Sequence, residues 1–283
     1  MDLSYVSVFV YFILTIIYFT FFKPKPTLQD VQTPQNYNTF SQKTYRNLTI
    51  YFVILLTIQF FMNAAIVVNK CGGNSANNFY LAFKYTFFPW IFIYGIMIVV
   101  LVAFPGFKSA FSDVLGYAYV SNKVNILFSH LLVKPDIDEN MQKVSTDGNK
   151  RELQNTADAI LKIFGNLSIL VNKIVPENFE NFWKILTPLM KDDFKNGAQG
   201  QTLDELKTEL LDLVVVRENI GEMVWYFYTA ILIMVIVQFY IGSNACLSDS
   251  ETMQANYTQF LQEEQQLKDA NDLNNQIVYN VKQ

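Results

Sequence analysis

The sequence is poor in the residues that carry catalysis and bind metals. Its 283 residues include only two cysteines, Cys71 and Cys246, and one histidine, His130. A structural zinc site takes four Cys or His ligands, and the whole chain offers three. The sequence also lacks a phosphate-cradling glycine loop and a nucleophile elbow. We therefore predict no enzyme activity, no cofactor-binding residues and no metal site.

Charge is scarce as well, since only 16% of the residues are charged while 51% are hydrophobic. A run of about twenty uncharged apolar residues is long enough to cross a bilayer as a helix. Buried helices of soluble proteins usually carry charge on one face, whereas four windows of this length contain no Asp, Glu, Lys, Arg or His. They are Leu3–Phe22, Leu48–Val68, Tyr85–Phe104 and Met223–Ile241. The sequence thus predicts an all-α membrane protein with four transmembrane helices. We interpret the first as a retained anchor, because it lacks the basic start and small-residue cleavage pattern of a signal peptide.

Lysine and arginine near the span ends indicate the orientation. The segment after the first span is basic, whereas the amino terminus and the segment directly after the fourth span are the least basic. Basic flanks favour the cytosolic side. We expect the amino terminus, residues 69–84 and the tail on the non-cytosolic side, and residues 23–47 and 105–222 in the cytosol.

The two cysteines both follow directly on a span. Cys71 lies three residues past the second span and Cys246 five residues past the fourth, so the expected topology brings both out on the same face. Adjacent helix ends can bring two Cα atoms within the roughly 7 Å that a disulfide needs. Cysteine catalysis would need a histidine or a lowered thiol pKa, and His130 is expected on the opposite side. An intramolecular disulfide is our interpretation, with free thiols or links between chains as alternatives.

Amide side chains are the most polar groups inside the spans. Gln59 and Asn63 lie four residues apart in the second span and share a helix face, and Gln238 lies in the fourth. The absence of ionisable residues within the spans argues against a transporter or proton pump. We expect these three side chains to make interhelical hydrogen bonds. A pore lining is the alternative.

Between the third and fourth spans the sequence predicts a helical, partly amphipathic extramembrane domain, residues 105–222. Its first helix, in 107–133, either lies along the membrane surface or belongs to the domain. Farther on, an apolar stripe continues from Leu206 into the fourth span and predicts one helix over about 203–241. Three large side chains on the apolar seams are candidates for packing against a partner. They are Phe164, Trp183 and Leu206. The predicted organisation is 1–104 for three spans and their loops, 105–222 for the domain, 223–241 for the fourth span and 242–283 for a polar tail, helical or disordered.

Three stretches together resemble a known family. They are "VNKCGG", "YTFFPWIFIYGIMIVVLVAFPGFKSAFSDVLGYAYV" and "NACLSDSETMQANYTQFLQEE", in this order. They are similar to multi-spanning virion membrane proteins of large icosahedral DNA viruses, especially algal viruses and their mimivirus-like relatives. The resemblance covers roughly residues 45–265. It implies a protein of the internal virion membrane, with a host membrane derived from the endoplasmic reticulum as its site during assembly.

From these features we expect a transmembrane minor capsid protein that ties the internal membrane to the protein shell. The expected partners are the lipid bilayer and other capsid or virion membrane proteins, and a homo-oligomer remains open. No nucleic acid is expected, because the basic residues near the membrane are too few for such a patch. The alternatives are a membrane-fusion component that acts when a virus enters the cell, and a channel or viroporin subunit.

Overall fold

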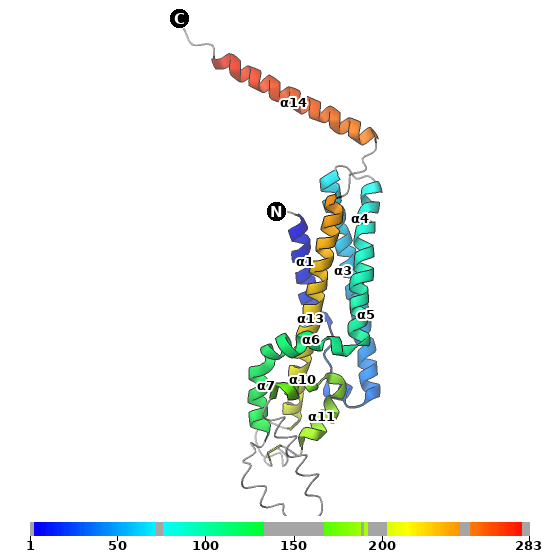
Figure 1. Ribbon diagram of the computed structural model, residues 1–283, viewed down its shortest axis with the longest axis vertical. Coiled ribbons are helices and arrows are strands. Elements are labelled where there is room, and N and C mark those ends of the chain that lie inside the picture. Colours follow the sequence, from blue (N-terminus) through cyan, green and yellow to red (C-terminus); the bar gives the residue numbers. More distant parts are fainter. Residues whose placement is uncertain are drawn as a thin grey trace, which may run out of the picture.

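The computed structural model describes residues 3–71, 76–132, 167–187, 190–191, 203–243 and 250–278. Within these ranges the secondary structure is helical, and the one β feature is an isolated bridge between Leu132 and Met190. Four helices are long and apolar enough to cross a membrane. The protein is therefore an all-α membrane protein, as the sequence predicts. Figure 1 shows the four spans side by side above a helical domain, with one further helix projecting from the opposite end.

Three of the four spans extend beyond the predicted windows, and the third ends at Ala103, one residue before the predicted end at Phe104. The first is α1 (Leu3–Ile17) with the π-helical turn η1 (Tyr18–Phe22), and the second is α3 (Pro34–Cys71). The third consists of α4 (Ala76–Pro89), the π-helical turn η2 (Trp90–Gly95) and α5 (Ile96–Ala103), and the fourth is α13 (Leu203–Ser243). In α3 the hydroxyl of Thr33 accepts from the amide of Asn36, which caps a helix whose first residue is proline. This start places fourteen residues of the expected loop 23–47 in the helix.

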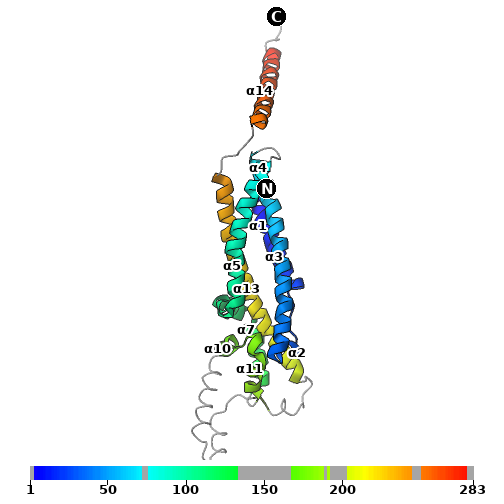
Figure 2. The same cartoon turned by 90° about the vertical axis from the view of Figure 1, so that its right-hand side faces the viewer.

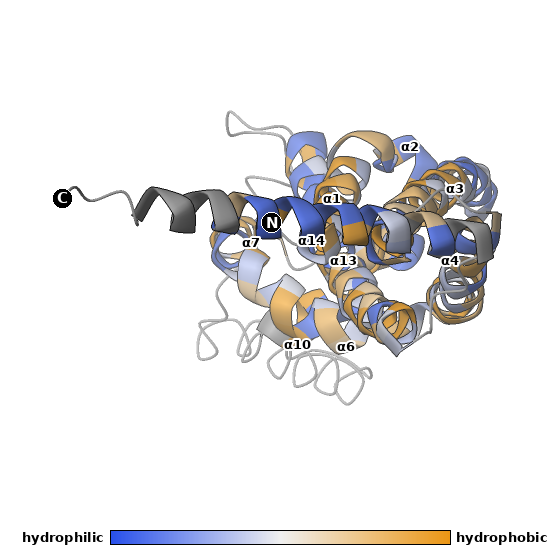
Figure 3. Ribbon diagram, turned by 90° about the horizontal axis from the view of Figure 1, so that it is seen from above, coloured by the Kyte–Doolittle hydropathy of each residue, from blue (hydrophilic) through white to orange (hydrophobic). Residues whose placement is uncertain are grey.

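The bundle buries polar side chains and exposes apolar ones, which is the arrangement expected of helices in lipid. Along α1 the side chains of Ser7, Tyr11 and Thr15 are buried, whereas Phe9 and Ile13 are exposed. In water the apolar face of a helix turns inward, but lipid tails are as apolar as leucine, so polar side chains gain by meeting inside. Figure 3, viewed along the bundle, shows hydrophobic residues on all of its helices. The exposed apolar surface of the spans is the surface that contacts lipid.

Short helices surround the first half of α13 and form the extramembrane domain. They are α2 (Leu28–Val31), η3 (Pro105–Phe107), α6 (Ser109–Phe111), η4 (Ser112–Gly116), α7 (Tyr117–Leu131), α10 (Leu167–Lys173), η5 (Pro176–Asn178) and α11 (Phe179–Leu186). The apolar residues of α2, α7, α10 and α11 share one core with the first half of α13. The domain lies at the end of the bundle opposite the amino terminus and α14 (Ser250–Val278), as both side views show (Figures 1 and 2). The bundle thus has the two faces that the expected topology requires, and which face is cytosolic stays a prediction.

One continuous helix joins the two parts of the molecule. The 41 residues of α13 correspond to about 60 Å at 1.5 Å per residue. Its residues from Leu206 to Val215 pack in the domain core, and those from Tyr226 to Ile241 pack in the bundle core. The helix predicted over 203–241 is confirmed, and it connects the fourth span to the domain without an interruption.

For residues 107–133 the sequence left two alternatives, a helix along the membrane surface or a helix of the domain. The structure shows that different parts of this stretch follow different alternatives. In α7 the face formed by Val120, Val124 and Leu131 is buried in the domain core, so this helix belongs to the domain. The residues before it differ, because Phe107 and Val114 are more than half exposed directly beside the end of a span. The sequence pattern did not separate these parts.

Candidate functional site

A carboxylate and two ammonium groups meet where the bundle joins the domain. Glu222 directly precedes the apolar part of α13, Lys23 follows η1, and Lys108 follows the turn η3 that ends the third span. The Oε2 atom of Glu222 lies 2.9 Å from Nζ of Lys23 and 3.0 Å from Nζ of Lys108. The three side chains are only 7%, 11% and 22% exposed, respectively. This ion cluster ties the ends of three spans together.

The electrostatics of the ion cluster follow from its burial. Removing a charge from water is costly unless an opposite charge compensates it. Burial lowers the pKa of Lys23, although the attraction of Glu222 opposes this shift. Burial also acts to lower the pKa of Lys108, but there the attraction of Glu222 outweighs it and the pKa is raised. The hydroxyl of Tyr226 donates to the other oxygen of Glu222 at 3.0 Å, so the carboxylate is bonded on both oxygens.

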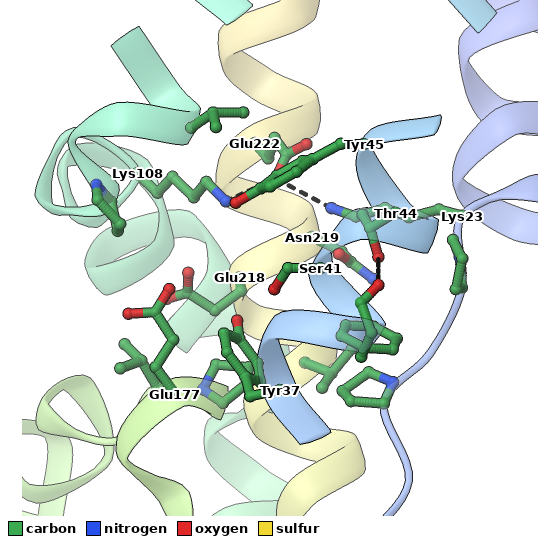
Figure 4. Close-up of a pocket in the computed structure, with 18 of the residues that line it drawn as sticks. Lys23, Tyr37, Ser41, Thr44, Tyr45, Lys108, Glu177, Glu218, Asn219 and Glu222 are labelled. Atoms are coloured by element: carbon green, nitrogen blue, oxygen red, sulfur yellow. Dashed lines mark hydrogen bonds and ion pairs between the residues drawn. The ribbon is translucent and has the colours of Figure 1, made fainter. Parts of the chain in front are cut away.

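A cleft opens from the ion cluster toward the domain. Figure 4 shows its labelled side chains, which come from α3, α13, η5 and the segments next to Lys23 and Lys108. Charged residues of both signs line it, together with the tyrosines Tyr37 and Tyr45. The charged lining residues are Lys23, Lys108, Glu177, Glu218 and Glu222. The cleft is thus a polar recess at the edge of the apolar spans.

A buried arginine fastens the domain to α13 five residues before Glu222. The guanidinium of Arg217 donates to the carbonyl oxygens of Val171 and Ile174, at the end of α10, and contacts the carboxylate of Glu218 at 2.8 Å. The side chain of Arg217 is fully buried. Carbonyl groups at a helix end carry partial negative charge and lack intrahelical partners, so a cation is favoured there. Arg217 therefore caps α10 and holds it against α13.

Two glycines allow α13 to cross η4 in close contact. A Cβ atom on Gly116 would lie 2.4 Å from the carbonyl oxygen of Arg217, and one on Gly221 would lie 2.7 Å from the backbone nitrogen of Ser112. Real Cβ atoms do not approach backbone atoms this closely. The crossing places η4 next to the ion cluster and to Arg217, so the domain meets the bundle by direct backbone packing.

Hydroxyl groups form a second network inside the bundle. The hydroxyl of Tyr11 donates to the carbonyl oxygen of Tyr226 at 2.8 Å and lies 3.0 Å from the hydroxyl of Tyr94. The hydroxyl of Tyr51 lies 2.8 Å from Oγ1 of Thr15 and 3.4 Å from the hydroxyl of Tyr94. Residues from all four spans take part. These hydrogen bonds fix the relative rotation of the helices, which apolar packing in lipid specifies less strongly.

The three amides singled out from the sequence all bond across helices. Gln59 accepts from the hydroxyl of Ser7 at 2.9 Å, and Asn63 donates to Oγ1 of Thr86 at 2.9 Å. Gln238 donates to Asn63 at 3.4 Å and accepts from Ser4 at 3.1 Å. Both Gln59 and Asn63 are at most 2% exposed. The contacts are those expected of interhelical hydrogen bonding.

Of the two cysteines predicted to form a disulfide, the structure describes only Cys71. Cys71 is the last residue of α3, packs against the bundle core and is not a free thiol. Beside it, the ammonium of Lys70 donates to the carbonyl oxygens of Ile241 and Gly242 at 2.7 Å each, so the ends of α3 and α13 are adjacent. Cys246 lies outside the described residues, and the Cys71–Cys246 disulfide stays a prediction.

The partner-packing candidates need correction. Trp183 is 6% exposed and Leu206 is 2% exposed, and both lie in the core of the domain. The ring of Trp183 packs against Phe179 and lies 5.8 Å from the ammonium of Lys207. These side chains are occupied by the domain itself, because the apolar seam of α11 faces α13. Phe164 lies outside the described residues.

The ion cluster and the buried arginine were missed in the sequence. In the sequence Lys23, Lys108 and Arg217 are recognisable only as basic residues near span ends, and no motif distinguishes Glu222 from other acidic residues. Only the positions of these residues in the sequence could have indicated the ion cluster. Glu222 directly precedes the uncharged fourth span, and Lys23 directly follows the uncharged first span. Nothing in the linear sequence pairs them, because the two are 199 residues apart.

No protein-family model, curated protein or solved structure matches this chain. In the described part of the chain, no group of three His, Cys, Asp or Glu residues is placed to hold a metal ion. The interpretation of the site therefore depends on its geometry. That geometry brings together buried ion pairs, backbone packing and helix capping at one junction, and all of them fasten the domain to the membrane bundle.

Proposed function

We propose that this protein is a structural membrane protein that holds a helical domain in a fixed position against a bilayer. The observation that carries the proposal is the continuity of α13 through both cores. The ion cluster and Arg217 support it, because they fasten α13 to the third span, to the segment after the first span and to α10 within a few residues of the membrane edge. A domain attached in this way transmits force to the bilayer.

In the setting that the family resemblance implies, this attachment ties the internal membrane of a virion to its protein shell. The role needs a lipid-facing bundle, a stiff connection and an extramembrane surface for the shell protein. Because Trp183 and Leu206 are internal, we assign the contact surface to exposed apolar side chains of the domain instead. Ile126 on α7 is 53% exposed and Ile185 on α11 is 63% exposed.

The contacts of the amides favour a structural role over a channel. Gln59 and Asn63 bond to Ser7, Thr86 and Gln238 of neighbouring spans. Side chains used in this way hold helices together and do not line a water-filled path. A membrane-fusion component has one specific observation in its favour, namely the exposed apolar side chains Phe104, Phe107 and Val114 after the third span.

The test is a surface variant that leaves the core intact. Ile126→Glu combined with Ile185→Glu places charge on the assigned contact surface, and Thr208→Glu is the control at an exposed position of α13. We expect the double variant to insert and melt like the wild type but to yield membranes without an ordered shell in cryo-electron micrographs. Normal particles would contradict the anchoring role. Normal particles that fail to infect would favour the fusion component.

A further inference from the structure

We propose that the cleft beside the ion cluster binds the headgroup of a phospholipid that carries both a phosphate and an ammonium group, as in ethanolamine or choline lipids. The lipid belongs to the leaflet that faces the domain. The inference depends on the bundle spanning a bilayer and not on the role in a virion. Three features of the cleft carry it: its depth relative to the bilayer, the order of its charges and its tyrosine rings.

The cleft lies at the depth of the headgroup layer. Its apolar end contains Leu48 and Val102, which belong to the second and third spans, and it continues past Lys23 and Lys108 at the ends of the first and third spans. Polar headgroups occupy the layer directly outside the hydrocarbon core. A lipid in the leaflet next to the domain can therefore reach the cleft with its headgroup while its acyl chains stay beside Leu48 and Val102.

The ammonium groups of Lys23 and Lys108 form the phosphate end. Each ammonium carries three donors, and both groups contact the same oxygen of Glu222. Two positive charges thus face one carboxylate, and the cluster has a surplus of one positive charge and unused donor capacity. Lys108 is 22% exposed, so a headgroup can approach it without opening the fold. A lipid phosphate matches this end in charge and in hydrogen bonding.

The opposite end of the cleft is acidic. Glu218, whose carboxylate also contacts Arg217, lies one helical turn before Glu222, and Glu177 lies on η5. Figure 4 shows both side chains beside Tyr37. None of the ion pairs in the described part of the chain involves Glu177. Carboxylates and tyrosine rings together are a suitable environment for an ammonium group, because a cation is attracted to both.

The order of charges decides which headgroup fits. In an ethanolamine or choline lipid the phosphate is attached to the glycerol, and the ammonium follows it, farther from the acyl chains. The cleft has its lysines at the membrane edge and Glu177 and Glu218 farther along, which is the matching order. Its lining contains three carboxylates and two ammonium groups. A headgroup with negative charge only, such as phosphoglycerol, would meet repulsion at the acidic end.

Native mass spectrometry of the full chain in mild detergent tests the proposal. The protein is offered equal amounts of phosphatidylethanolamine and phosphatidylglycerol with the same acyl chains. We expect one retained lipid with a preference for ethanolamine. Glu177→Gln should reduce that preference about two- to fivefold, the value of one partly exposed ion pair. Glu209→Gln, at an exposed position of α13 away from the cleft, should leave it unchanged.

A second variant tests the phosphate end. Lys108→Gln should weaken retention of both lipids, whereas Lys43→Gln, at an exposed position on α3, should not. Melting curves recorded on the same samples show whether each variant is folded, and the Glu177→Gln comparison does not disturb the ion cluster. Equal retention of the two lipids by the wild type, or an unchanged preference in folded Glu177→Gln, would overturn the proposal.

Discussion

Neutralising Glu222 should destabilise the whole molecule, although the residue lies outside the apolar part of the spans. The change Glu222→Gln keeps the shape of the side chain and removes its charge. Lys23 and Lys108 then face each other without a carboxylate, at 11% and 22% exposure. Breaking a fully buried ion pair typically costs 3–5 kcal/mol. Because the partly exposed Lys108 can turn its ammonium toward water, we expect a loss of about 2–3 kcal/mol.

Thermal unfolding in detergent micelles, followed by tryptophan fluorescence, measures this effect. Trp90 lies in the bundle core, Trp183 lies in the domain core, and the indole of Trp225 donates to the carbonyl oxygen of Phe107 at the junction. One kcal/mol corresponds to about 2–4 °C in Tm for a chain of this size, so the expected decrease is about 4–12 °C. Bundle and domain should lose stability together, because α13 belongs to both cores.

Two further variants separate the loss of charge balance from the loss of shape. Glu209→Gln, at an exposed site, should change Tm by less than about 2 °C, since exposed substitutions rarely exceed 0.5 kcal/mol. Replacing Lys23, Lys108 and Glu222 together by methionine should recover much of the lost stability, because an apolar cluster leaves no charge uncompensated. A Tm of Glu222→Gln equal to that of the wild type, or a triple variant less stable than Glu222→Gln, would refute this account of the ion cluster.

Three other predictions concern packing, topology and the cysteines. Gly116→Ala should cost about 1–3 kcal/mol by overpacking, whereas Gly242→Ala, with open space around it, should be neutral in the same melting assay. Protease added to sealed microsomes should digest residues 105–222 and spare the tail, and the reverse pattern would overturn the orientation. The oxidised protein should run as a monomer in non-reducing gels and resist maleimide, with a disulfide contribution of up to about 5 kcal/mol. Labelling of Cys71 and Cys246 without reductant would count against that bond.

The membrane-spanning part of the fold could be predicted from the sequence because its evidence is local. A charge-free window of about twenty residues needs no tertiary information to be recognised, and the four spans of the structure contain every residue of these windows except Phe104. The continuity of α13 could also be predicted, since the apolar stripe from Leu206 runs into the fourth window without a proline. The start of α3 at Pro34 could not be predicted, because the polar sequence that extends this helix beyond the membrane resembles the sequence of a loop.

The candidate site could not be predicted because its residues meet only through tertiary structure. Lys23 and Glu222 lie at the ends of different spans. A lysine that follows a span looks the same in the sequence whether its side chain is solvated or buried. Trp183 illustrates the opposite error. Its seam was correctly identified as apolar, but a helical period cannot say whether the seam packs within the chain or against a partner. To predict what the apolar face of a helix packs against, the positions of the neighbouring helices must be known.

A distance measurement across the membrane edge tests the rigid connection most directly. Spin labels are attached at Asp212→Cys in the domain part of α13 and at Tyr228→Cys in the bundle part, both exposed positions, with the native cysteines replaced by serine. An uninterrupted helix places these two Cα atoms about 24 Å apart. Double electron–electron resonance in lipid nanodiscs should give one narrow distribution consistent with that separation. A broad or two-peaked distribution would show a hinge between the membrane and the domain, and would contradict the anchoring account.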